Sequence, residues 1–387
     1  MASLGKTLDV AVIDEIQMIG DPDRGWAWTQ ALLGLKAKEI HLCGEASAVP
    51  LVKKICETLD EEVIINEYTR LTPFEVKEQS LSNDLSKIKK GDCVVAFSRN
   101  DIFALKNKIE SSTGLRCAVA YGGLPPETRA LQAKAFNDPE SGFDVLVASD
   151  AVGMGLNLNI KRIVFTTVEK FNGKKFSFVS IPQLKQIAGR AGRFGTAYNE
   201  GEVTTLKPGD LTYVKECVAA PIIPLELFAL QMPGEKFSGL LAIAEKLEHI
   251  KLPLRDLYQF VTAPVSTRNE KSMDVIETLA KKFSKSEICT LDDVITLPNV
   301  TPTSPEGLMS LENNHKNIML YMWLSLRYPE TFTSTPEHSF ETKTRCEVMI
   351  DDVLKNSGFA KKKRGIKNNN KKVKKDSKSG FKKSKKE

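Results

Sequence analysis

Short apolar runs alternate with stretches of helical spacing from residue 8 to residue 206. The runs are of strand length and lack the polar alternation of a half-exposed strand, which is typical of strands buried on both faces. Asp101 is placed to cap one of the intervening helices. The predicted strands lie at 8–14, 40–43, 63–68, 93–97, 117–121, 144–148, 163–168 and 203–206, and the predicted helices at 25–35, 48–59, 102–111 and 125–136. This alternation implies parallel sheets covered by helices.

The pattern divides the chain into two α/β units, a helical region and a tail. Pro73 lacks a backbone donor and restricts the residue before it, so 70–73 is predicted to be a linker. After residue 206, prolines separate helical stretches, and the apolar stretch at 308–328 should be a long buried helix. The other helical stretches lie at 228–232, 239–247 and 255–261. The predicted domains are therefore 1–73, 74–206, 207–355 and 356–387.

Composition places the chain among soluble globular proteins of a reducing compartment. It is 41% hydrophobic and 27% charged, which is ordinary for that class. No apolar run approaches the length of a membrane-spanning helix. Seven cysteines and four histidines are scattered without metal-ligand spacing, so we expect no zinc site and no disulfide framework.

The net charge of +6 hides a strong asymmetry along the chain. Residues 356–387 hold fourteen Lys/Arg and two Asp/Glu, a balance of +12, whereas the remainder is mildly acidic. A tail so rich in Lys, Asn, Ser and Gly should be disordered. It would serve as a polyanion-binding arm, with a solubility tail or a nuclear-type address as the alternatives. If it is such an arm, its removal should lower both the affinity for a polyanion and the salt dependence of binding.

The first candidate chemistry follows the strand at 8–14. Asp14 and Glu15 stand at its carboxyl end, which is where open α/β sheets place their ligands. An aspartate there can hold Mg²⁺, as in nucleotide hydrolases, and the neighbouring glutamate can orient or deprotonate a water. The alternative is an acidic exit from a strand into a loop.

The second candidate is the stretch QLKQIAGRAGRF at 183–194. Spacings of three and four predict that Gln186, Arg190 and Arg193 share one face of a helix. Interspersed Gly and Ala would allow close approach, and guanidinium forks suit phosphate oxygens. The alternative is a solvated basic helix, which glycines would weaken by about 1 kcal/mol each.

Together these elements predict a nucleotide site between the two units. Asp14 and Glu15 would carry Mg²⁺ and a water on one wall, and the arginines would stabilise phosphoryl charge on the other. A Gly-rich loop after a strand, with Gly153 and Gly155, would line the second wall. Because the walls belong to different units, the nucleotide state would control their closure.

The order of short motifs resembles that of superfamily 2 helicases, and in particular the DExH-type RNA helicases of the mitochondrial degradosome. The resemblance is strong over residues 8–206 and looser to residue 355. The motifs are DEIQ (14–17), GEAS (44–47), FSRND (97–101), YGGLPP (121–126), SDAVGMGLN (149–157) and QIAGRAGR (186–193). This resemblance implies two RecA-like parallel-sheet domains, the first of them truncated, and an all-α C-terminal domain before the disordered basic tail.

The resemblance also implies specific roles and partners. The activity would be ATP- and Mg²⁺-dependent 3′ to 5′ unwinding of RNA, and often of DNA, in the mitochondrial matrix beside a 3′ to 5′ exoribonuclease. Asp14 would bind Mg²⁺ with Glu15, and Glu15 would activate the attacking water. Gln186 would contact the γ-phosphate, Arg190 and Arg193 would be arginine fingers, Gly153, Gly155 and Asn157 would lie near the nucleotide, and Ser98, Arg99 and Ser149 near the nucleic-acid backbone.

The family pattern also requires a phosphate loop, GxxxxGK[ST], which these 387 residues do not contain. The sequence Gly5-Lys6-Thr7 is too close to the strand at 8–14 to open a crossover helix. We therefore expect the chain to be a fragment or a late start, and to show no RNA-stimulated ATPase activity by itself. The competing hypothesis is an ATPase-inactive module that binds RNA or the exoribonuclease. A nucleotide-sugar or dehydrogenase fold would need a GxGxxG after an early strand, and the sequence has none.

Overall fold

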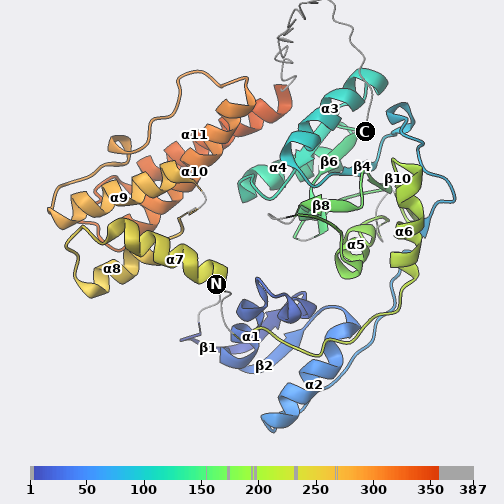
Figure 1. The fold of residues 1–387 in the computed structure, drawn as a ribbon, viewed down its shortest axis with the longest axis horizontal. Coiled ribbons are helices and arrows are strands. Elements are labelled where there is room, and N and C mark those ends of the chain that lie inside the picture. Colours follow the sequence, from blue (N-terminus) through green and yellow to red (C-terminus); the bar gives the residue numbers. More distant parts are fainter. Residues whose placement is uncertain are drawn as a thin grey trace, which may run out of the picture.

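A computed structural model gives the fold of the chain in three adjoining parts (Figure 1). Arg193 and the tail from residue 357 onward lie outside the described residues, so the predictions for them stay untested. The structure describes residues 4–153, 155–171, 175–192, 195, 198–230, 234–265, 267 and 269–356, with the backbone alone for 234–237 and 356.

The first α/β unit is built on a parallel pair of strands. Strands β1 and β2 pair in the register Ala11↔Ile40, and helix α1 lies between them in the sequence. Thr7 begins β1 rather than a helix, so Gly5-Lys6-Thr7 is no phosphate loop. The predicted strand at 8–14 is confirmed. The elements are β1 (Thr7–Ile13), the 3-10 helix η1 (Ile16–Gly20), α1 (Gly25–Gly34), β2 (Lys36–Leu42) and α2 (Val49–Thr58).

The second unit is a six-stranded sheet in which every pair of neighbours is parallel. The strand order is β3-β10-β7-β4-β6-β5. Successive residues of β4 pack on opposite faces: Val94 lies against α3, whereas Cys93 and Val95 share a core with α5 and α6. This is the doubly covered parallel sheet that the apolar runs predict. The strands are β3 (Phe74–Val76), β4 (Asp92–Val95), β5 (Cys117–Ala120), β6 (Val145–Ala148), β7 (Arg162–Phe165) and β10 (Gly201–Thr205).

Helices cover this sheet and form the remaining part of the chain. Helix α10 buries Leu311, Ile318, Tyr321 and Leu324, which confirms the predicted buried helix at 308–328. No helix among the described residues is long and apolar enough to cross a membrane. The helices are α3 (Arg99–Thr113), α4 (Pro126–Asn137), α5 (Ile181–Ala188), α6 (Pro208–Ala219), α7 (Gly234–Leu247), α8 (Leu254–Val261), α9 (Glu270–Ser284), α10 (Pro305–Ser325) and α11 (Pro336–Asn356).

Two predicted elements are wrong. The residues at 63–68 form no strand but an extended connector, in which Ile64 and Tyr68 are exposed and no neighbouring strand supplies partners. The residues at 228–230 form no helix, and 231–232 lie outside the described residues. In contrast, the hairpin β8 (Glu169–Phe171) and β9 (Phe176–Phe178) has no counterpart in the sequence prediction.

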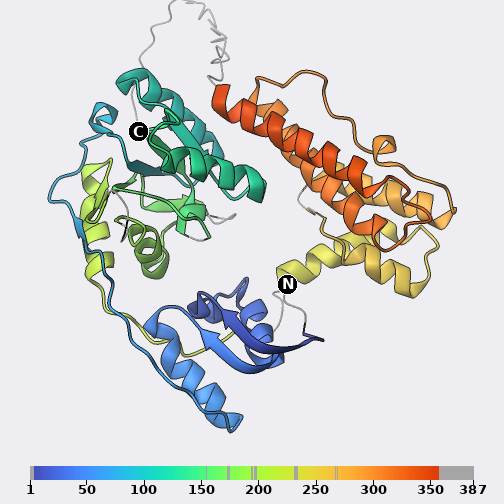
Figure 2. The ribbon, with the colours of Figure 1, turned by 180° about the vertical axis from the view of Figure 1, so that it is seen from behind.

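The segment 221–230 returns from the second unit to the first. Its Leu225 N–H donates to Ser47 O at 2.8 Å, and its Ala229 N–H donates to Ile19 O at 3.1 Å. Leu225 and Phe228 pack on the core of the first unit. In both ribbon views this segment runs beside the connector between the units (Figures 1 and 2). We call 221–230 the strap.

Candidate active site

The acidic wall of the candidate site begins where β1 ends. Glu15 adopts the left-handed conformation, with φ 53° and ψ 47°, and its N–H donates to Asp14 Oδ1 at 2.8 Å. A non-glycine residue in this region is strained, and such strain is found mainly at functional sites. The indole N–H of Trp28 donates to Asp14 O at 2.9 Å and helps to hold this turn in place.

Gln17 joins this turn to the end of the neighbouring strand. Its amide nitrogen donates to Glu15 Oε2, and its amide oxygen accepts the Glu45 N–H at 3.0 Å. A Cβ at Gly44 would lie 2.3 Å from Gln17 Oε1, so only glycine leaves room for this link. No role was predicted for Gln17, Gly44 or Glu45. Their signal is the pair of motifs DEIQ and GEAS, which the structure brings into contact.

The basic wall is carried by the turn after α5. Helix α5 ends at Ala188, so the prediction that Gln186, Arg190 and Arg193 share one helical face is wrong. The helix stops because the chain turns at Gly189 and then pairs with the sheet, where Ala191 bridges Ile160. Arg193 lies outside the described residues.

Arg190 nevertheless reaches the loop after β6. Its Nε donates to Gly153 O at 3.1 Å, and its Nη2 donates to the same oxygen. Gln186 also lies close to this glycine, with its Oε1 3.4 Å from the position of a Cβ on Gly153. Gly153, at the end of the 3-10 helix η4 (Asp150–Gly153), therefore lies beside two of the predicted site residues.

The two walls meet through one ion pair. Arg190 Nη2 lies 3.5 Å from Glu15 Oε1, and the two side chains are 28% and 29% exposed. At such exposure an ion pair contributes about 1 kcal/mol or less, so it can open without great cost. The contact places a guanidinium opposite a carboxylate across the boundary of the two units.

The remaining candidates lie along the carboxyl edge of the second sheet. Gly155 has φ 69°, and Asn157 is exposed, with its backbone oxygen accepting from Asn137 Nδ2 at 2.7 Å. Ser149 follows β6, and its Oγ accepts the Ala151 N–H at 3.1 Å. None of these three residues contacts the Arg190–Glu15 pair within the described contacts.

Ser98 and Arg99 begin helix α3 at the same edge. Ser98, not Asp101, is the N-cap: its Oγ accepts the Asp101 N–H at 3.1 Å and donates to Asp101 Oδ2 at 2.6 Å. The prediction that Asp101 caps this helix is therefore wrong by one turn. Asp101 is instead the hydrogen-bond partner of the true N-cap, Ser98. Arg99 turns toward the helical region, where its Nη2 lies 3.2 Å from Glu312 Oε1. Burial raises the pKa of the Glu312 carboxyl. The hydrogen bond from Tyr121 and the charge of Arg99 act in the opposite direction.

The acidic wall fits a hard divalent cation, and the basic wall across from it fits a phosphate. Asp14 is exposed and Glu15 half-buried, so their carboxylate oxygens are accessible, and Mg²⁺ prefers such oxygens. Across from them, Arg190 supplies the planar donors that suit phosphate oxygens.

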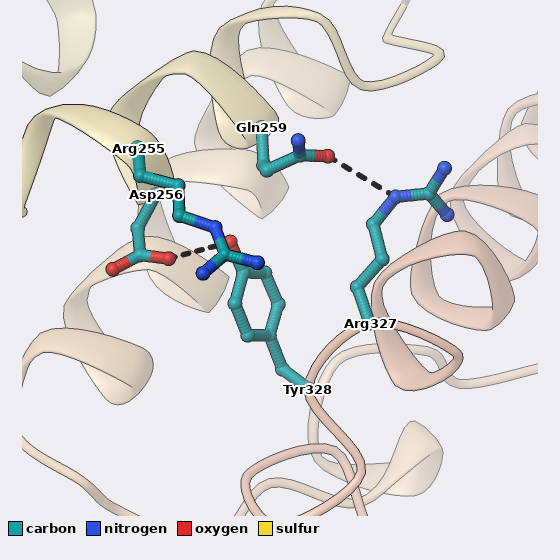
Figure 3. A pocket seen from close by; sticks show the side chains of 5 residues that line it. All are labelled: Arg255, Asp256, Gln259, Arg327 and Tyr328. Atoms are coloured by element: carbon teal, nitrogen blue, oxygen red, sulfur yellow. Dashed lines mark hydrogen bonds between the residues drawn. The ribbon is translucent and has the colours of Figure 1, made fainter.

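Two other places in the described residues are candidates for a ligand. A surface hollow of about 400 Å³ between α8 and the end of α10 is lined by arginines and polar groups, of which Arg327 bonds Gln259 and Tyr328 bonds Asp256 (Figure 3). None of the predicted site residues lines this hollow.

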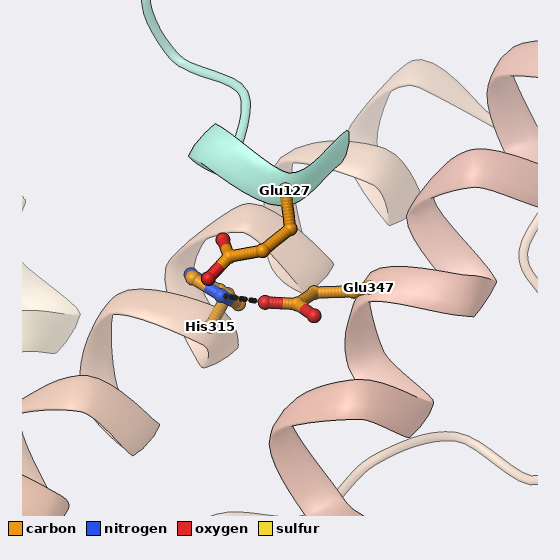
Figure 4. Close-up of side chains that lie close together, drawn as sticks. All are labelled: Glu127, His315 and Glu347. Carbon is orange, nitrogen blue, oxygen red and sulfur yellow. Dashed lines mark hydrogen bonds and ion pairs between the residues drawn. The ribbon is translucent and has the colours of Figure 1, made fainter. Parts of the chain in front are cut away.

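The second place is where α4 meets α10 and α11 (Figure 4). Potential metal-ligating atoms of Glu127, His315 and Glu347 lie within 4.8 Å of one another. However, the Lys343 ammonium lies 2.7 Å from carboxylate oxygens of both Glu127 and Glu347, and its hydrogen bond lowers the pKa of Glu127. The Lys343 ammonium already compensates part of the negative charge that a metal ion would need. The contacts of the cluster join α4 of the second unit to α10 and α11 of the helical region.

Family models match most of the chain. A model described as the DEXQ-box helicase domain of Suv3 matches residues 1–68, and one described as the helicase conserved C-terminal domain matches residues 76–195. Suv3 C-terminal domain 1 matches residues 242–284, and the ATP-dependent RNA helicase SUV3 C-terminal domain matches residues 308–356.

Curated relatives extend the similarity over nearly the whole chain. The mitochondrial DExH-box ATP-dependent RNA helicase DExH18 of Arabidopsis thaliana is 44% identical over 86% of this chain and 47% of its own length. The human mitochondrial ATP-dependent RNA helicase SUPV3L1 is 40% identical over 86% and 47%. DExH16 of A. thaliana is 39% identical over 92% and 68%. The chain thus spans about half the length of the first two.

Proposed function

The chain belongs to the SUV3 family of ATP-dependent RNA helicases, and on that premise we propose that its two α/β units couple ATP hydrolysis to RNA unwinding. The observation that carries this proposal is the contact between Glu15 and Arg190. It sets the end of one parallel-sheet strand opposite the Arg-bearing turn of the other unit. Such an arrangement can hydrolyse a nucleotide only when both units close around it.

Each residue of the contact has a distinct proposed role. Asp14 and Glu15 would hold Mg²⁺, which supplies charge neutralisation to the phosphates when it is bound. Glu15 would also accept a proton from the attacking water, with Gln17 fixing the orientation of its carboxylate. Arg190 would leave Glu15 for the phosphate, and Arg193 would act beside it. Gln186, Gly153, Gly155 and Asn157 would line the nucleotide side of the second unit.

The finer features of the function are also proposals. The RNA would run over the edge that carries Ser98, Arg99 and Ser149, since these residues sit at the carboxyl ends of neighbouring strands of one sheet. We propose a 3′ to 5′ direction of unwinding, a 3′ to 5′ exoribonuclease as partner, and the mitochondrial matrix as location. The names of the relatives support only the mitochondrial part of this proposal. The division of the chain into domains at 1–73, 74–206, 207–355 and 356–387 also remains a proposal.

The test is RNA-stimulated ATPase activity of the full-length gene product, with unwinding of duplexes that carry a 3′ or a 5′ single-stranded tail. Glu15→Gln should lower turnover at least about 100-fold, because the amide cannot accept a proton. The matched control is Asp9→Asn on the same strand, whose exposed carboxylate pairs only with Lys38 among the described contacts and should not affect turnover.

Turnover that survives in Glu15→Gln would contradict the proposed role of this residue. RNA binding without any RNA-stimulated turnover in the unaltered protein would favour the alternative, a module that binds RNA or the exoribonuclease without hydrolysing ATP. Unwinding of the 5′-tailed duplex alone would contradict the proposed direction.

A further inference from the structure

Arg70, in the connector between the two α/β units, reaches the turn that carries Arg190. Its Nη1 donates to Gly189 O at 2.6 Å, and its Nη2 donates to Ala191 O at 2.6 Å and to Gly192 O at 3.1 Å. One guanidinium thus holds backbone carbonyls on both sides of Arg190. These carbonyls follow the end of α5, where oxygens lack helical partners and a cation is favoured.

Arg70 is itself held in place. Its Nε donates to Thr72 O, and its guanidinium lies over the Phe74 ring, 5.0 Å from the ring centre. An arginine has five N–H donors, and the bonds to Thr72 and to the turn engage four of them. Few donors remain for a nucleotide, so Arg70 is suited to hold the turn and not to bind a phosphate.

The charge of Arg70 also acts on the turn. Desolvation of its guanidinium and the nearby charge of Arg190 lower the pKa of Arg70, so the two guanidinium groups repel each other. This repulsion disfavours any position in which Arg190 folds back on its own turn. It therefore favours the observed position, in which Arg190 extends toward Gly153 and Glu15.

We propose that Arg70 is a positioning residue for Arg190. It ties the connector between the units to the turn, so that Arg190 is aimed across the boundary when the units close. This inference rests on the proposed ATPase function. It adds a residue outside the motif series, on a segment that the sequence indicates only as a linker.

The test compares three variants of the full-length gene product. Arg70→Lys keeps the charge but cannot hold three carbonyls in a fork. It should lower the kcat of RNA-stimulated ATP hydrolysis about 10- to 100-fold, the expected effect of a misplaced group, with the KM for ATP changed less than about threefold. In an Arg190→Ala background, Arg70→Lys should lower kcat no more than about twofold further, since both residues act as one unit.

The matched control is Arg162→Lys in the same sheet. Arg162 binds both carboxylate oxygens of buried Asp92 and the Lys87 carbonyl, and none of these described contacts is with the turn. Arg162→Lys should lower the unfolding temperature but leave kcat unchanged. An unchanged kcat in Arg70→Lys, an equal loss of kcat in Arg162→Lys, or an additive loss in the Arg190→Ala background would each overturn the proposal.

Amide hydrogen exchange separates this inference from the proposed function. The amides of Arg190, Ala191 and Gly192 donate to Ile187, Ala188 and Ile160 carbonyls. In nucleotide-free protein their exchange should be at least about tenfold faster in Arg70→Lys than in the unaltered chain, because the turn opens more often. If no ATPase activity is found, faster exchange still supports the positioning role, and unchanged exchange rejects it.

Discussion

At the scale of single residues, two glycines with nearly the same positive φ lie in different surroundings. Gly155 has φ 69° and Gly192 has φ 71°. A Cβ on Gly155 would meet nothing within 4 Å, whereas a Cβ on Gly192 would lie 2.6 Å from the backbone nitrogen of Gly201. The pair therefore separates the cost of a left-handed conformation from the cost of a close backbone contact.

We predict different losses of unfolding free energy for the two alanine variants. Gly155→Ala should cost about 1–2 kcal/mol, from the left-handed conformation alone. Gly192→Ala should cost about 1–3 kcal/mol more, because the strand at Gly201 must shift. Urea denaturation measures both, and Gly155 serves as the control. Equal losses would mean that the close approach of residues 192 and 201 does not exist in solution.

At the scale of elements, the helical region is joined by charge as well as by its apolar core. Glu277 on α9 contacts Lys281 on its own helix and Lys246 on α7, and His249 Nε2 lies 3.2 Å from the same carboxylate. The side-chain hydrogen bonds from Lys281 and Lys246 lower the pKa of Glu277 to about 2. This carboxylate therefore links α7 to α9 only while it is ionised.

Its contribution to stability should depend on pH in a defined window. Because the folded pKa is depressed, the contribution is present above the ordinary value of 4.5 and is lost as pH falls toward about 2. Glu277→Gln should lower the unfolding free energy at pH 7 by about 1 kcal/mol or less, and by nothing near pH 2. Glu287→Gln, in a looser exposed pair with Lys285, should show no such dependence. A difference that persists near pH 2 would contradict this assignment.

The comparison of sequence and structure is also clearest at the scale of elements. Buried strands such as β4, β5 and β6 are predicted from their unbroken apolar runs, and the Asp14–Glu15 wall from the acids at the end of one run. The run at 63–68 begins with three apolar residues but pairs with no described strand, since pairing depends on neighbours distant in the sequence. The end of helix α5 before Arg190 depends on the bridge between Ala191 and Ile160, two residues that are distant in the sequence.

Other features of the site have no local signal at all. Arg70 lies in a segment whose pattern indicates only a linker, and its three carbonyl partners in the turn after α5 are more than a hundred residues away. Similarly, the partner of Arg99 is Glu312 on a helix of another region. Spacing along the chain identifies residues that share an element, whereas contacts between elements follow from packing.

At the scale of the whole molecule, the second unit and the helical region meet through buried charges. Glu312 is 8% exposed, its carboxylate accepts the Tyr121 hydroxyl, and Arg99 lies beside it and over the Tyr121 ring. Gln132 on α4 donates to Asp351 on α11 at 2.8 Å. Breaking one member of such a buried pair is costly because the other charge remains without compensation.

Paired substitutions should reveal this dependence. Arg99→Met and Glu312→Gln should each lower the unfolding free energy by about 1–3 kcal/mol, less than for a fully enclosed pair because Arg99 is 26% exposed. The double variant removes both charges, and the amide oxygen introduced by Glu312→Gln would still accept the Tyr121 hydroxyl, so it should recover at least half of the summed loss. Thermal unfolding of the four proteins measures the coupling. Strictly additive losses would show that the two charges act independently.

The strap gives the first unit a core that is not contiguous in the sequence. Leu225 and Phe228 pack on a core whose other described members lie between Ile13 and Cys56. On the ribosome these members are synthesised before the second unit, yet this part of the core remains open until the strap has emerged, which is a delay of about 10–30 seconds at usual elongation rates. During that interval its apolar surface is exposed to chaperones and proteases. A nascent chain released before the strap would leave the first unit incomplete, however well the six-stranded sheet had folded.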